Sequence, residues 1–207
     1  MKQVALVLFI GFALSLCNLS ERLHKGGSGS NTSGPSVSEN EARPEHGQPT
    51  AAQTAALAGG QEAKWERQGM SFTVPPNWTE AQQESKTLSW RSPGSGAASL
   101  IVSISPMAEE FPVESAINAA FDGAKTRAKN GEVDELKWVE IDGLKGVQFR
   151  EATPEKGDDH RRLQWMAYRK YTGQVQLVSV MLASEAKDFE RHKDAMYGIL
   201  YSLKIAH

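Results

Sequence analysis

Two neighbouring segments near the end of the chain, 160–171 and 174–183, carry apolar residues on both faces at a spacing of two. That spacing is typical of β-strands, and strands that are apolar on both faces are central strands covered on both sides. Thr172-Gly173 stands between the segments as a two-residue turn. The pattern predicts a long antiparallel hairpin in the middle of a sheet.

Shorter strands and two helices are predicted around this hairpin. Asp142-Gly143 forms a turn between two of the strands. Apolar residues three and four positions apart predict one helix behind Pro112 and a second that begins near Ser184, a good N-cap residue. The fold class is therefore α+β, a twisted antiparallel sheet with a helix on one face and a second helix or irregular cover on the other. The shorter strands are expected at 65–74, 86–90, 100–105, 132–141 and 147–151.

The N-terminal segment has the pattern of an export signal. Residues 4–19 form an apolar run behind Lys2. As a helix the run would span roughly 24 Å at about 1.5 Å per residue, which is less than the ~30 Å hydrocarbon core of a bilayer. We interpret residues 1–19 as a signal peptide or N-terminal membrane anchor. The protein is predicted to be extracytoplasmic, either membrane-tethered or periplasmic or secreted.

Cys17 is a candidate for lipidation. Leu14-Ser15-Leu16-Cys17 resembles the bacterial lipobox, although Leu16 stands where that motif has Gly, Ala or Ser. Cys17 is otherwise a small apolar member of the hydrophobic run. The sequence leaves three outcomes open, a lipidated, a cleaved or a retained N-terminal segment.

Residues 20–63 are predicted to be a disordered linker rich in Gly, Ser, Pro and Ala. Between 26 and 63 the only sizeable apolar residues are Val37 and Leu57, so burial cannot offset the entropy lost on ordering. The linker either tethers a folded module or is an extension with no spacing role. Residues 64–207 form the predicted globular domain.

Composition and charge narrow the function classes. The 207 residues include 23 Lys and Arg, 25 Asp and Glu and one Cys, with a net charge of −2. A nucleic-acid-binding surface needs an excess of positive charge, so this class is excluded. A single Cys also excludes a disulfide framework and a metal site built from several cysteines. No cofactor is predicted.

Two groups of side chains are candidates for metal binding. Asp158-Asp159-His160 lies at a predicted hairpin tip, and Asp188 and His192 lie four residues apart on the last helix. Such oxygen and imidazole ligands bind a divalent metal when they converge. A metal-dependent or hydrolytic enzyme that uses Asp158, Asp159, His160 and His192 is therefore the alternative function. The simpler interpretation is a solvated turn and a surface pair, and we predict neither catalytic nor metal-binding residues.

The five tryptophans divide into two groups. Core packing is predicted for Trp78, Trp90 and Trp165. Trp65 and Trp138 lie in more polar strands and are predicted to be exposed, which makes them the candidate binding residues.

Several segments resemble one superfamily. Phe72-Thr73-Val74-Pro75-Pro76-Asn77-Trp78 resembles the opening F-x-V-P-x-x-W hairpin of the PsbP-like and DcrB-like superfamily. The segment Ile141-Asp142-Gly143-Leu144-Lys145-Gly146 and a terminal helix that ends Ser202-Leu203-Lys204 are similar too. The resemblance covers 64–207 and implies an α/β/α sandwich that binds or assembles, usually without catalysis.

The favoured function is a non-enzymatic, exported or membrane-tethered binding or assembly module of the bacterial envelope. Its predicted partner is a protein or an apolar ligand in the envelope, with membrane contact through the N-terminal segment and no nucleic acid. Resemblance of fold alone is a weak argument for function, so the function has to be inferred from the geometry and chemistry of the site.

Overall fold

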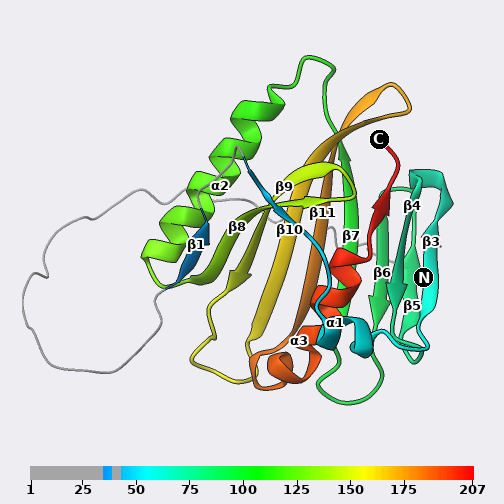
Figure 1. Ribbon diagram of the computed structural model, residues 1–207, viewed down its shortest axis with the longest axis vertical. Coiled ribbons are helices and arrows are strands. Elements are labelled where there is room, and N and C mark those ends of the chain that lie inside the picture. The colour runs from blue at the N-terminus through cyan, green and yellow to red at the C-terminus, as the bar shows by residue number, and fades with distance from the viewer. Residues whose placement is uncertain (1–34, 39–42) are drawn as a thin grey trace, which may run out of the picture. The chain divides into compact units, whose positions relative to one another are not determined.

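A nine-stranded sheet runs through the part of the chain that the computed structural model describes, residues 35–38 and 43–207 (Figure 1). Its strand order is β1-β8-β9-β10-β11-β7-β6-β5, and β2 also pairs with β8. The strands are β1 (Ser36–Ser38), β2 (Glu45–His46), β5 (Thr79–Gln83), β6 (Thr87–Arg91), β7 (Ser99–Pro106), β8 (Val133–Ile141), β9 (Leu144–Glu151), β10 (His160–Tyr171) and β11 (Gln174–Glu185).

A second sheet of three strands and three α-helices complete the described elements. The small sheet has the order β12-β4-β3. Its strands are β3 (Gln61–Trp65), β4 (Met70–Val74) and β12 (Lys204–Ile205), and the helices are α1 (Ala51–Ala56), α2 (Val113–Lys129) and α3 (Ala186–Tyr201).

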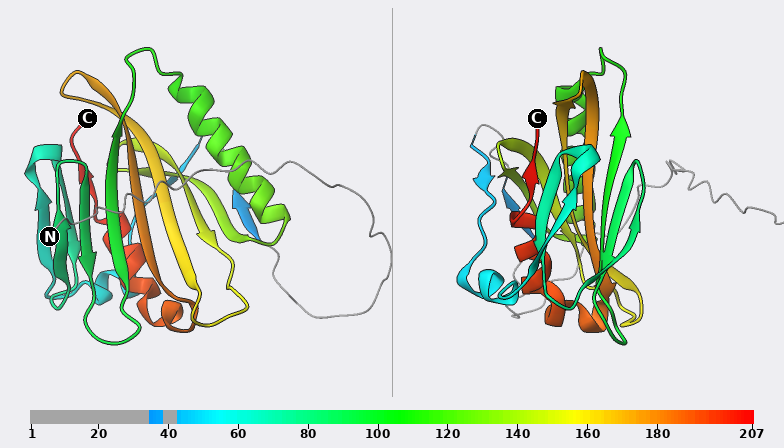
Figure 2. Two further views of the ribbon diagram at one scale, coloured as in Figure 1. Left: turned by 180° about the vertical axis from the view of Figure 1, so that it is seen from behind. Right: turned by 90° about the vertical axis from the view of Figure 1, so that its right-hand side faces the viewer.

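The helices lie on opposite faces of the large sheet. Helix α2 contacts β8, β9 and β10 on one face, whereas α3 contacts β10, β11 and the small sheet on the other. Figure 1 shows α1 and α3 in front of the sheet, and α2 comes forward in the view from behind in Figure 2. Each face has its own apolar core, the larger one beneath α3 and the smaller one beneath α2. The predicted α/β/α sandwich is confirmed.

The central hairpin forms as predicted. All residues of β10 pair with β11, from His160 with Glu185 to Tyr171 with Gln174. Thr172 and Gly173 both have positive φ, at 50° and 77°. A two-residue turn with both residues in the left-handed region matches the twist of the strands that it joins. Asp142 and Gly143, with φ of 48° and 82°, turn between β8 and β9 in the same way.

Two boundaries differ from the prediction. The expected strand 65–74 is a hairpin, because the chain turns at 66–68 and at Gly69, whose φ is 56°. Ser184 does not cap the last helix, since the pairing of β11 with β10 extends to Glu185 and α3 begins at Ala186 without a side-chain cap. Strand pairing there outweighs the local capping preference of serine.

The predicted linker, 20–63, is corrected where the structure describes it, because 36–38 form β1 and 43–63 contain β2, α1 and part of β3. Thr50 begins α1 with a capping box, in which its hydroxyl accepts from the Gln53 amide at 3.3 Å and the Gln53 side chain accepts from the Thr50 amide at 2.9 Å. Leu57 packs against the larger core and supplies the burial that holds the segment.

The predicted leader, 1–19 with Cys17, lies outside the described residues. Within the described ranges, none of the helices is both long enough and apolar enough to cross a membrane.

Candidate functional site

A cluster of polar side chains lies between the sheet and α3, on the face that also carries the larger apolar core. We call Glu135, Gln148, Arg150, Tyr197 and Tyr201 the Glu135 cluster. Glu135 pairs across the strands with Arg150, which places both on one face of β8 and β9. Tyr197 and Tyr201 are four residues apart on α3 and share one side of that helix.

The Glu135 carboxylate is the centre of the cluster. It accepts hydrogen bonds from the Tyr197 hydroxyl at 2.9 Å and from the Gln148 amide at 2.7 Å. The Tyr201 hydroxyl donates to the Gln148 side-chain oxygen at 3.0 Å, and Gln148 is fully buried. The Arg150 guanidinium lies 3.4 Å from the carboxylate. Every member of the cluster is thus bonded to another member.

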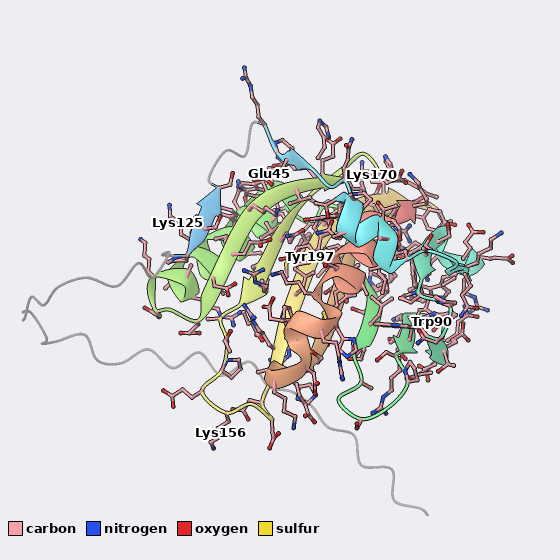
Figure 3. The ribbon with its side chains drawn as sticks, turned by 60° about the horizontal axis from the view of Figure 1, so that its bottom comes forward. Glu45, Trp90, Lys125, Lys156, Lys170 and Tyr197 are labelled. Atoms are coloured by element: carbon pink, nitrogen blue, oxygen red, sulfur yellow. The ribbon has the colours of Figure 1, made fainter. Side chains whose placement is uncertain are left out.

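The N-terminal part of the described chain covers this cluster. We call residues 35–38 and 43–57 the arm. A cavity of about 290 Å³ lies between the arm, α3 and strands β8 and β9, and Glu45, Glu135, Lys137 and Tyr197 are among the residues that line it. The Lys137 ammonium lies 3.2 Å from Glu45 of the arm and 3.5 Å from Glu135. Figure 3 labels Glu45 and Tyr197, which come from β2 and α3.

Burial governs the protonation of the cluster. It raises the pKa of the Tyr197 hydroxyl, and the nearby Glu135 carboxylate raises it further. Burial likewise raises the pKa of Tyr201. Burial lowers the pKa of Lys137, but Tyr201, Glu135 and Glu45 outweigh it, so that the pKa of this ammonium is raised. At neutral pH the two phenols are therefore donors, and Lys137 is charged.

The chemistry of this arrangement favours binding over proton transfer. The Glu135 oxygens already accept two hydrogen bonds and face two cations, which leaves the carboxylate poorly suited to act as a general base. The Tyr197 hydroxyl is held as a donor by its raised pKa.

Alkaline pH is expected to destabilise the protein through these tyrosines. Because their folded-state pKa values lie above the usual value of about 10, the folded protein keeps protons that the unfolded chain loses. The contribution of these two tyrosines to the free energy of unfolding is fully present below about pH 10 and is lost as the pH rises further. Urea unfolding at a series of pH values checks this, and Tyr197→Phe should make the decline shallower. An equal decline of stability with pH in the wild type and in Tyr197→Phe would contradict the raised pKa of Tyr197.

The predicted exposure of Trp65 and Trp138 is wrong. Each is only 2% exposed. The Trp65 indole donates to the Glu84 carbonyl at 3.2 Å, and the Trp138 ring stacks on Phe121 of α2 with centroids 4.8 Å apart. Neither side chain is available to a partner. The predicted core tryptophans Trp78, Trp90 and Trp165 are buried.

The metal candidates do not form one site. Asp158 pairs with Lys187, and the ring of His192 lies 3.0 Å from the Gly96 carbonyl oxygen. Asp188 pairs with Arg191 at 3.0 Å. His160 is exposed at the start of β10, and Asp159 is exposed before it. Among residues 35–38 and 43–207, no three His, Cys, Asp or Glu side chains are grouped so as to hold a metal ion.

A second candidate surface lies on the opposite face of the sheet. Helix α2 covers β8, β9 and part of β10, and the described residues leave the same face of β11 and β7 uncovered (Figure 2, left). Met181 pairs with Ile101, and Leu177 pairs with Tyr168, so these side chains are neighbours. We call this surface the open face; its half-buried apolar residues are Ile101, Leu177 and Met181, and it borders on Met166 and Tyr168, which pack against the core beneath α2.

Sequence analysis missed both surfaces. Charged and amide residues two positions apart, Glu135 and Lys137 on β8 and Gln148 and Arg150 on β9, were a signal for the Glu135 cluster. The open face had a weaker signal, namely serines that alternate with apolar residues along β7. Neither pattern shows which helix covers which face.

The comparisons with known proteins concern the fold. No protein-family model matches this sequence, and no curated protein matches it either. The similarity to solved structures is one of fold, in agreement with the sandwich that the resemblance implied.

LpqN of Mycobacterium tuberculosis, described as involved in cell envelope biogenesis, is a structural neighbour. The two chains are 13% identical with a TM-score of 0.52, over 80% of this chain and 90% of LpqN. Cyanobacterial PsbP (CyanoP) from Synechocystis is 12% identical with a TM-score of 0.45, over 71% of this chain and 92% of CyanoP.

A Bacteroides thetaiotaomicron protein is 13% identical with a TM-score of 0.47, over 72% of this chain. The match spans 49% of that protein, so this chain corresponds to about half of its length.

Proposed function

We propose that this protein is a non-enzymatic binding or assembly module that works outside the cytoplasm, in the cell envelope, and that its N-terminal segment brings it to the membrane. The export pattern of residues 1–19 supports the location. LpqN, which shares the fold, is involved in cell envelope biogenesis, and this agrees with the proposal.

The open face is the observation that carries the proposal. It presents three half-buried apolar side chains on the adjacent strands β7 and β11, and serines lie between them. One of the three is Met181, and the flexible side chain of a methionine adapts to the surface that it meets. An apolar surface that the described elements leave uncovered, as they leave this side of β7 and β11, marks an interaction site.

A protein is the partner that suits this face. Small ligands bind in concave sites that enclose most of their surface. The open face is instead one side of two adjacent strands, β11 and β7, with side chains standing from the pleat. Apolar residues that alternate with hydroxyls provide both the burial and the hydrogen bonds of a protein interface.

Site-specific crosslinking in cells tests the proposal. A photoreactive amino acid at Ser103, which pairs with Ser179 in the middle of the face, should give a discrete crosslinked product. Ile101→Lys should reduce that product at least tenfold, because burying an unpaired charge in an interface costs several kcal/mol.

Gln82→Lys, on the exposed strand β5, is the matched control and should leave the product unchanged. Circular dichroism confirms that both variants fold. A product that survives Ile101→Lys, or one that Gln82→Lys also removes, would count against the open face as the binding surface.

A further inference from the structure

The outer edge of β8 holds two separate pieces of the arm. Strand β1 pairs in parallel with β8 from Ser36 opposite Glu135 to Ser38 opposite Lys137. Strand β2 then pairs in parallel with the same edge, with Glu45 opposite Val139. Figure 1 shows β1 beside β8, although the two strands are far apart along the chain. This edge therefore accepts short extended segments in a parallel orientation.

Few buried contacts hold β1 and β2 against β8. Glu45, His46 and Ser36 are exposed. The pair between His46 and Glu140, at 3.4 Å, involves a histidine side chain that is 72% exposed. Ion pairs at such exposure contribute little, typically below about 1 kcal/mol. Val37 packs against the core beneath α2 and is the main apolar contact of β1.

Two glycines fix the position of the arm. A Cβ atom on Gly47 would lie 2.9 Å from Ile141 Cγ1 and 3.0 Å from Tyr201 Cδ1, and the Gly47 amide donates to the Glu140 carbonyl at 2.8 Å. On the other side, a Cβ on Gly198 of α3 would lie 2.8 Å from the Gln53 carbonyl oxygen of α1. At these two points the arm lies closer to the rest of the domain than a residue with a side chain would allow.

The two ends of the arm differ in how firmly they are held. Leu57, just after α1, packs against the larger core, and α1 contacts α3; β1 and β2 lie at the edge of the sheet, where Val37 packs against the smaller core and both residues of β2 are exposed. Segments with few buried contacts open at low free energy while the rest stays folded. The strands can therefore leave β8 while α1 stays in place.

We propose that the outer edge of β8 is a docking site for an extended segment of a partner protein, which runs parallel to β8 and replaces β1 and β2. Main-chain hydrogen bonds provide the affinity, and alternate side chains provide the specificity. The arm defines the chemistry of the partner segment. It carries an apolar residue where Val37 packs and an acidic residue that reaches Lys137, as Glu45 does. This surface is separate from the open face, and the proposal does not depend on it.

A peptide-binding experiment on the full chain tests the proposal. The probe is a fluorescent synthetic peptide with the sequence of residues 35–48, which keeps Gly47. In Gly47→Val the added side chain overlaps Ile141 and Tyr201, so the arm's own strands are weakened. The peptide should bind this variant at least tenfold more tightly than the wild type, in which the tethered arm competes at high effective concentration. Fluorescence polarisation measures the affinity.

Hydrogen exchange locates the binding. Amides of β8 should exchange faster in Gly47→Val than in the wild type, and the peptide should slow them again. Gly123→Val is the matched control, because a Cβ on Gly123 meets no atom within 4 Å, and it should behave as the wild type. Ile101→Lys should also leave peptide binding unchanged, which separates this proposal from the one about the open face.

Val37→Asp provides a second way to release the arm, should Gly47→Val fold poorly, since it removes the main apolar contact of β1. Equal peptide affinity for the wild type and both arm variants would overturn the proposal. Concentration-dependent dimers of the wild type in light scattering, with the arm exchanged between copies, would overturn the assignment to a partner protein.

Discussion

Replacing Trp165 by alanine is expected to lower the free energy of unfolding by about 3–5 kcal/mol. The side chain is fully buried on β10, beneath α3. Its indole nitrogen donates to the Val139 carbonyl at 3.3 Å, which ties β10 to the second strand away from it. Alanine would leave a cavity and would take away the donor for a buried carbonyl. Urea denaturation monitored by circular dichroism measures the change.

Trp165→Phe is the matched comparison for this substitution. It keeps most of the apolar volume but loses the indole donor, so its cost should be clearly smaller than that of alanine. A loss below about 1 kcal/mol for Trp165→Ala would show that the core relaxes around the cavity, against the close packing seen here. The two substitutions together separate the volume of the side chain from its hydrogen bond.

The parts of the fold that sequence analysis predicted well depend on local patterns. The hairpin of β10 and β11 follows from alternation and from a two-residue turn at Thr172-Gly173. The same is true of the turn at Asp142-Gly143. In both cases the residues that determine the structure are neighbours in the chain, so their pattern is visible without the fold.

The errors occurred where distant residues decide the environment. Trp138 has polar neighbours along β8, yet its own face is covered by Phe121 of α2. Trp65 ends β3, and its indole is held by the Glu84 carbonyl from the segment between β5 and β6. Polarity along a strand says nothing about the helix or loop that packs across it.

The arm shows a different reason for error. Its composition predicts disorder because it has few large apolar residues. The structure holds it with Val37, Leu57 and two close approaches at glycine, at Gly47 of the arm and at Gly198 of α3. Glycine allows such a close approach because it has no side chain. In an analysis of composition, however, glycine indicates a flexible segment.

Gly146 illustrates the same point within the resemblance to the superfamily. It belongs to a segment that the sequence linked to that superfamily, without a stated role. A Cβ at this position would lie 2.6 Å from the Trp165 indole nitrogen and 2.5 Å from the Met166 carbonyl oxygen. The glycine therefore makes room for the buried tryptophan of the next strand, a relation that becomes visible only when β9 and β10 are paired.

Replacing Glu135 by alanine is expected to cost about 2–4 kcal/mol of stability. The side chain is 16% exposed, so the groups that it binds are largely shielded from water. Its loss would leave the Tyr197 hydroxyl and the Gln148 amide without their acceptor. It would also remove the carboxylate that lies 3.5 Å from the Lys137 ammonium. A buried donor without an acceptor costs about 1–3 kcal/mol. Urea denaturation at neutral pH measures the loss.

Two further variants show whether charge or hydrogen bonding is responsible. Glu135→Gln keeps an acceptor oxygen and similar volume but removes the negative charge, so it should lose less than alanine. Glu114→Ala removes a carboxylate that is 76% exposed and should change stability by no more than about 0.5 kcal/mol. If Glu135→Ala were as mild as Glu114→Ala, the cluster would be a solvated surface feature rather than the polar centre that joins α3 to the sheet beneath the arm.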